Sequence, residues 1–166
     1  MNTVLIGNAV ALLGAAIMVS TGFLKTKKQI LTVQCAQFCV LGTSNLILGG
    51  FTGVTSAVVS LMRNLICLKR TFTLPLKLAF IALQAALALA FNREGLLGVL
   101  PALSTVIYTW FLDAENETTL KLSIIAAQLC WVMYDLSLQN YVSFAFDIGT
   151  VVSTAIGILM LRRSRR

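Results

Sequence analysis

Hydrophobic residues fall into long runs separated by short breaks that contain glycine or polar residues. The pairs Gly49–Gly50 and Gln139–Asn140 leave room only for tight turns, so the runs on either side of each pair are predicted to be antiparallel neighbours. Each run approaches the roughly 20 apolar residues that a bilayer-spanning helix needs. The pattern predicts helices at residues 3–23, 30–48, 51–68, 74–91, 96–112, 119–138 and 141–161.

Composition supports a membrane protein. Hydrophobic residues make up 58% of the 166 residues and charged residues only 11%, against roughly 25% charged in soluble domains, and the mean hydropathy is +0.88. Seven helices use up the chain and leave no soluble domain. We therefore predict an all-α polytopic membrane protein with seven transmembrane helices, whose surroundings are the lipid bilayer.

Candidate chemistry is sparse. The chain has no histidine, and Cys35, Cys39, Cys67 and Cys130 all lie inside apolar runs. Cys35 and Cys39 share a helix face, but no second cysteine pair and no histidine completes a metal site. We interpret the cysteines as buried structural thiols. We expect no metal, no cofactor and no enzymatic activity, because no convincing nucleophile and base are present.

The basic residues predict the orientation. If the N-terminus lies outside, every lysine and arginine except Arg63 and Arg93 falls on the cytoplasmic side. This asymmetry is typical of the positive-inside rule and predicts N-out and C-in, so the net charge of +7 reports orientation and not a nucleic-acid partner. The first basic cluster, Lys25 to Lys28, follows the first run, so we expect a retained first helix instead of a signal peptide.

The two ends of the chain resemble each other. Aligning Leu5 with Leu96 places CAQFC of residues 35–39 over AAQLC of residues 126–130, and two added residues place one VVS segment (58–60) over another (151–153). One linker helix between the copies gives them the same direction, as in parallel repeats about an axis along the membrane normal. The predicted organisation is a three-helix repeat at 1–70, a linker helix at 71–91 and a second three-helix repeat at 92–166.

Three stretches carry a family resemblance: GVTSAVVSLMRNLICL at 53–68, LPALSTVIYTW at 100–110, and Cys130-Trp131-Val132 followed by Asp147. With the three-plus-one-plus-three pattern, the chain resembles the YgjV family of bacterial inner-membrane proteins along nearly its whole length. It also resembles the related SWEET and PQ-loop (MtN3-like) superfamily of small-solute facilitators. The resemblance implies a SWEET-like fold, a multi-pass location in the bacterial inner (cytoplasmic) membrane and a transporter ancestry without an assigned substrate.

One departure from the SWEET pattern concerns hinges. SWEET transporters carry a hinge proline in each of four helices, whereas here only Pro101 is suitably placed and Val10 stands at the matching position of the first helix.

Polar residues inside a bilayer are costly, so they face one another or a cavity. They recur at helical spacing in four runs (30–48, 51–68, 119–138 and 141–161), which we expect to line a path between the repeats near the midplane. The run at 74–91 lacks such a stripe. The predicted solute-binding residues are Gln37, Asn45, Ser60, Asn64, Gln128, Trp131, Tyr134, Asp147 and Ser153, and the predicted coupling or ion-pair residues are Arg63, Asp135 and Asp147.

Each of these residues has a plainer interpretation. Gln37 and Gln128 either contact solute or only hydrogen-bond between helices. Arg63 either binds substrate or extends its side chain to the headgroups. Asp135 and Asp147 lie near the outer helix ends, so either an exposed outer vestibule or proton coupling would explain them.

The aromatic and small residues leave similar alternatives. Trp131 and Tyr134 either stack on a ring-shaped solute or pack between helices. Ala82, Ala86 and Ala90 form a small-residue face suited either to a homodimer seam or to internal packing.

Two functional hypotheses remain from the sequence. The first is a facilitator of sugars or other small polar metabolites, in which the two repeats rock about the linker helix. The second is a membrane scaffold or regulatory protein that kept the fold and lost transport.

Overall fold

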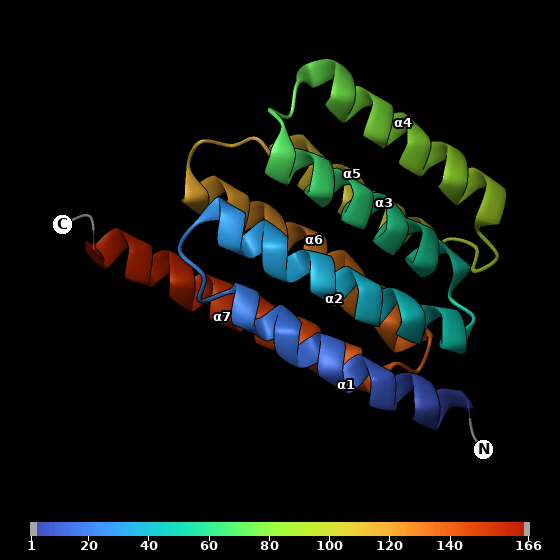
Figure 1. The fold of residues 1–166 in the computed structure, drawn as a ribbon. Helices are drawn as coiled ribbons and strands as arrows, with labels where there is room; N and C mark the ends of the chain where they lie inside the picture. The colour runs from blue at the N-terminus through green and yellow to red at the C-terminus, as the bar shows by residue number, and fades with distance from the viewer. Residues whose placement is uncertain (1–2, 165–166) are drawn as a thin grey trace.

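The computed structural model describes residues 3–164, and this part of the chain forms seven helices without a strand (Figure 1). They are α1 (Thr3–Thr21), α2 (Lys27–Leu48), α3 (Phe51–Lys69), α4 (Leu74–Phe91), α5 (Val99–Phe111), α6 (Glu117–Ser137) and α7 (Tyr141–Ser164). All seven predicted helices are present, and their ends differ from the predicted ones by a few residues. Every helix but α5 is long and apolar enough to cross a membrane.

Helix α5 is shorter than predicted. Its 13 residues extend about 20 Å, which is less than the roughly 30 Å of a bilayer's hydrocarbon core. The chain instead makes a turn at residues 95–98, where Gly95 has a left-handed backbone with φ of 64°. Pro101 is consequently the third residue of α5, where an amide hydrogen has no partner within the helix. Pro101 therefore does not have the place inside a long helix that a hinge proline of the SWEET pattern would need.

The predicted tight turns are present. Gly49 ends α2 in the left-handed region with φ of 82°, and the amide of Gly50 donates to the carbonyl of Asn45 at 2.9 Å. Between α6 and α7, Gln139 has φ of 58°, and the amide of Asn140 donates to the carbonyl of Asp135 at 2.9 Å. Both turns make their flanking helices antiparallel neighbours, as expected.

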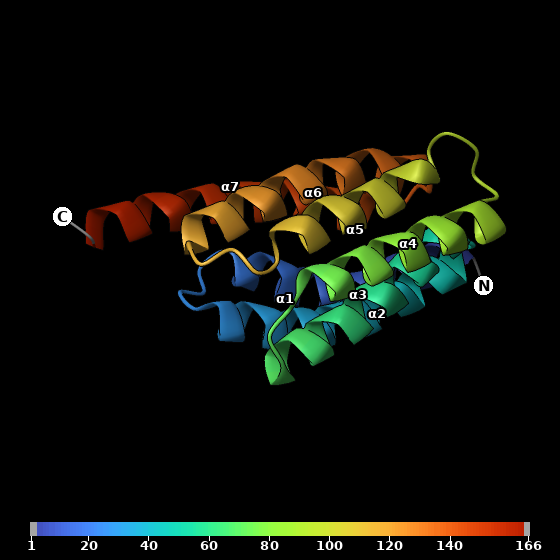
Figure 2. The ribbon, with the colours of Figure 1, turned by 90° about the horizontal axis from the view of Figure 1, so that it is seen from above.

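Six helices close into a ring. Following the contacts, α1 packs on α2, α2 on α3, α3 on α5, α5 on α6, α6 on α7, and α7 again on α1. Helix α4 lies outside this ring, against α3 and α5, as Figures 1 and 2 show. The first and last helices are thus neighbours, although the two ends of the chain lie at opposite ends of the bundle (Figure 1).

The seam between α1 and α7 depends on small residues and one lysine. A Cβ atom at Gly157 would overlap the backbone oxygen of Gly22, so only glycine permits this approach. The buried Nζ of Lys121 donates to the same Gly22 carbonyl at 2.6 Å, just past the end of α1. A cation there complements the negative end of the helix dipole.

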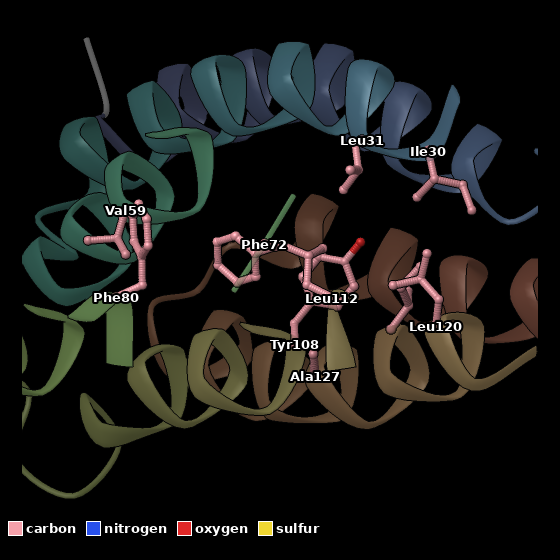
Figure 3. Packing of buried hydrophobic residues seen from close by; sticks show 10 residues of the cluster. Ile30, Leu31, Val59, Phe72, Phe80, Tyr108, Leu112, Leu120 and Ala127 are labelled. Atoms are coloured by element: carbon pink, nitrogen blue, oxygen red, sulfur yellow. The ribbon is translucent and has the colours of Figure 1, made fainter. Parts of the chain in front are cut away.

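Buried apolar side chains gather where α2 begins and α5 ends (Figure 3). They come from α2 to α6 and from the α3–α4 connection: Ile30, Leu31, Val59, Phe72, Phe80, Tyr108, Leu112, Leu120, Ile124 and Ala127. This end of the bundle also carries most of the basic residues. The apolar cluster therefore packs α2, α3, α5 and α6 together, and joins α4 to them, toward the basic end of the bundle.

The outer faces are apolar, as lipid requires. Leu89 is 88% exposed and Leu96 90% exposed, and Ala82, Ala86 and Ala90 also lie on the exposed side of α4. The homodimer seam on α4 stays a prediction.

The cysteines are free, and Cys39 is exposed while the other three are half-buried. The expectation of four buried thiols is thus wrong, because the cysteines lie on the sides of their helices that face away from the interior of the bundle.

Candidate functional site

A polar cavity lies inside the six-helix ring. Side chains of α1, α2, α3, α5, α6 and α7 line it, and α4 contributes none of them. The volume open to water is about 60 Å³, enough for about five water molecules. The predicted site residues that line it are Gln37, Asn45, Ser60, Arg63, Gln128, Trp131, Asp135 and Asp147.

Arg63 is the cationic group of the cavity, and its side chain is fully buried. Its Nε and Nη2 donate to Asn64 Oδ1 at 3.2 and 3.1 Å, and its Nη1 donates to Thr109 Oγ1 at 2.8 Å and to the Thr105 carbonyl at 3.4 Å. The guanidinium also lies over the Tyr108 ring, 4.7 Å from its centroid. The interpretation that Arg63 reaches the headgroups is therefore wrong, because α5 supplies partners inside the ring.

Gln34 joins the helices around Arg63. Its Oε1 accepts hydrogen bonds from Asn64 Nδ2 at 3.1 Å and from the Tyr108 hydroxyl at 2.9 Å. One amide oxygen thus connects α2, α3 and α5. Because Asn64 in turn accepts from Arg63, the position of the guanidinium depends on all three helices.

Asp135 and Asp147 form a pair of buried carboxyl groups toward the other end of the cavity. They are 4% and 1% exposed and contact each other. Gln128 Nε2 donates to Asp147 Oδ1, and Asn140 Nδ2 donates to Asp135 Oδ1 at 3.3 Å. The interpretation of an exposed outer vestibule is therefore wrong. Two buried carboxyl groups in contact cannot both be ionised cheaply, because like charges repel at this distance.

Four polar atoms of the cavity have no hydrogen-bond partner among the described residues. They are the acceptors Gln37 Oε1, Asn45 Oδ1 and Asp147 Oδ2 and the hydroxyl oxygen of Ser143, all on side chains at most 6% exposed. A buried acceptor without a hydrogen bond costs about 1–3 kcal/mol. These atoms therefore define where a water molecule or a solute with hydrogen-bond donors would bind.

Asn64, Tyr134 and Ser153 were predicted to bind solute but do not line the cavity. Ser153 Oγ donates to the Val19 carbonyl across the seam between α1 and α7, at 3.1 Å. The Tyr134 hydroxyl accepts from the amide of Gly53 at 3.1 Å, and its ring meets that of Trp131 edge to face. The Ser153 and Tyr134 side chains therefore join neighbouring helices. For Tyr134 this is the plainer of the two interpretations given above.

Several cavity residues on α5 were missed, namely Ser104, Thr105 and Tyr108, and Gln34 of α2 was not selected. The signal was present in the STVIYTW segment. Its polar side chains lie at positions 104, 105, 108 and 109, which is the spacing of one helix face.

A model of the Imp-YgjV family, described as bacterial inner membrane protein, matches residues 5–165. No curated protein and no solved structure matches the chain. The family description agrees with the six apolar helices that are long enough to span a bilayer. The chain therefore belongs to the Imp-YgjV family and is a multi-pass protein of the bacterial inner membrane.

Proposed function

We propose that the protein carries a small polar solute across the inner membrane by alternating access between two three-helix repeats, α1–α3 and α5–α7. The observation that carries this proposal is the polar cavity, which the ring helices line and which holds buried polar atoms without hydrogen-bond partners. A polar interior of this kind is expensive in a bilayer and marks a solute or ion pathway.

The helix contacts support the division into repeats. If α1–α3 exchanges places with α5–α7, the contact between α1 and α7 becomes the contact between α5 and α3. Both contacts are present, and α2 and α6 then hold equivalent places in the ring. The linker α4 stays outside, so it connects the repeats without entering the path. This symmetry supports the proposal of a parallel repeat pair, related to the SWEET and PQ-loop arrangement, with a solute site at the repeat interface.

The orientation N-out and C-in follows from the charges at the two ends of the bundle. Lys27 begins α2 and Lys69 ends α3, while Arg162 and Arg163 lie in the last turn of α7, all at one end. Arg93 lies at the other end, between α4 and α5. The basic end then faces the cytoplasm.

Transport by the purified protein tests the proposal. Proteoliposomes that contain the protein are incubated with a metabolite extract, and mass spectrometry then identifies the compounds that they take up. The matched variants are Gln37→Ala/Gln128→Ala, which alters the cavity, and Leu89→Ala, which alters an 88% exposed position on α4. We expect uptake of a defined compound that the first variant lowers and the second preserves. If empty and protein-containing vesicles take up the same compounds, the transport proposal is wrong.

A non-transporting scaffold is the second candidate. The place of Pro101 in the first turn of α5 favours it, because a proline there bends no helix. In this case the cavity would hold water only, and the same experiment would detect no uptake.

A further inference from the structure

We infer that the cavity binds a small zwitterion of the amino-acid class, with its carboxylate on Arg63 and its ammonium group on the acceptors nearer the aspartate pair. This inference rests on the proposed function, because it names the substrate class of the same cavity. It follows from the charge at each end of the cavity and from the hydrogen-bonding capacity that the protein leaves unused.

Arg63 lacks an anionic partner. Within residues 3–164, its hydrogen bonds go to the neutral acceptors of Asn64, Thr105 and Thr109, and the described ion pair of the chain joins Lys77 and Asp113 instead. A fully buried charge is expensive unless it is paired. A guanidinium has five N–H donors, and the four contacts leave one hydrogen of Nη2 free. A ligand carboxylate would supply the missing charge.

The end of the cavity near the aspartate pair lacks hydrogen-bond donors and a positive charge. Asn45 Oδ1 and Asp147 Oδ2 receive no donor among the described residues, and the carboxyl pair has no lysine or arginine in contact with it. The groups that do face the pair are neutral donors: the amide of Gln128 from α6 and the amide of Asn140 from the turn. An ammonium group carries several N–H donors and no acceptor. It therefore fits this end and would be repelled by Arg63.

The two ends are close enough for one small molecule. Arg63 and Asp147 line the same cavity, whose volume open to water is only about 60 Å³. Arg63 lies twelve residues after the start of α3, and its side chain slopes toward the start of that helix, as helix side chains do. Asp147 lies six residues after the start of α7. Gln37, with its unpaired Oε1, lies on α2 between α1 and α3 and offers a further acceptor.

This arrangement disfavours other solute classes. A sugar would leave the Arg63 charge without a partner, a simple anion would face the carboxyl pair, and a simple cation would face Arg63. Only a molecule with both charges satisfies both ends. The site discriminates because each mismatched solute leaves a buried polar group unpaired.

Ligand binding to the full-length protein in detergent tests the inference. Calorimetric titrations use a panel of free amino acids with small, polar, acidic, basic and aromatic side chains, and also glucose and adenosine. The best amino acid is then compared with its carboxamide, which lacks the carboxylate, and with its N-acetyl derivative, which lacks the ammonium group. We expect each derivative to bind at least about tenfold more weakly, because each loses a charge-assisted hydrogen bond.

Variants assign the two ends. Arg63→Gln should bind the amino acid and its carboxamide with similar affinity, whereas Arg93→Gln, which alters an exposed arginine outside the cavity, should keep the tenfold preference. Asn45→Ala should reduce the preference over the N-acetyl derivative. Since Arg63→Gln could fail to fold, the derivative series on the wild-type protein decides the inference alone.

Each other result overturns the inference in a distinguishable way. Binding of glucose or adenosine without binding of amino acids would leave the proposed transport site standing and refute the zwitterion. Equal binding of the amino acid and its carboxamide would refute the role of Arg63. Absence of binding by every compound of the panel would count against both the inference and the proposed function.

Discussion

The hydroxyl group of Tyr134 should contribute measurably to stability although it lies outside the cavity. Gly53 is the third residue of α3, so its amide has no partner within that helix. The Tyr134 hydroxyl of α6 accepts this amide at 3.1 Å, and the tyrosine is fully buried. The contact is therefore an N-terminal cap that one helix supplies to another. Gly50 and Gly53 make room for it, since a Cβ atom at either position would crowd the Tyr134 side chain.

Tyr134→Phe removes the hydroxyl and keeps the ring with its edge-to-face contact to Trp131. Loss of a helix cap costs about 1 kcal/mol in soluble proteins, and interhelical hydrogen bonds in a membrane protein average about 0.6 kcal/mol. We therefore expect the free energy of unfolding to fall by about 0.5–1.5 kcal/mol. Tyr141→Phe is the matched control, because Tyr141 is 56% exposed and lies on the lipid-facing side.

Unfolding in mixed micelles with increasing SDS, followed by circular dichroism, measures this difference. Equal unfolding free energies for the two phenylalanine variants would refute the capping argument. A loss well above about 2 kcal/mol would also contradict it, because one neutral hydrogen bond does not contribute that much.

Three further predictions concern charges. Asp147→Asn should abolish any pH dependence of solute uptake by proteoliposomes while the protein still inserts, because an amide cannot take up or release a proton; an unchanged pH profile would remove Asp147 from coupling. Lys77→Ala should lower the free energy of unfolding by less than about 1 kcal/mol, since its 2.6 Å ion pair with Asp113 is partly exposed. A larger loss in the SDS titration would contradict this weak contribution of the ion pair. On a background without native cysteines, Arg93→Cys should react with a membrane-impermeant maleimide in intact cells and Lys28→Cys only after lysis; the opposite pattern would reverse the proposed orientation.

The helices were predictable because their signals are local. The run at 74–91 gave the bounds of α4 directly, and the glycines at 49 and 50 gave the turn between α2 and α3. The polar spacing along α2 likewise identified Gln37 and Asn45 as interior residues. Periodicity reports which residues share a face, and in a membrane protein the polar face points inward.

The errors share a physical cause. The position of a residue along its helix can be counted from the sequence. The residue that it contacts on a neighbouring helix cannot. Arg63 was expected near the headgroups, yet Thr109 of α5 accepts its hydrogen bond within the ring. Asp135 and Asp147 were placed at an open end, although Asn140 and Gln128 cover them. Tyr134 binds the amide of Gly53, a partner 81 residues away in sequence, which no local pattern indicates.

The contact between α1 and α7 fixes the order in which the protein can be assembled. Helix α7 follows the other helices of the ring and the linker along the chain, so the ring stays open while these are synthesised and inserted. During that interval Gln128 of α6 has no Asp147 to bind. The polar faces of α2 and α6 are then not yet surrounded by a complete ring of helices. A chain arrested before residue 141 therefore leaves polar side chains of α6, such as Gln128, without the partners that α7 supplies.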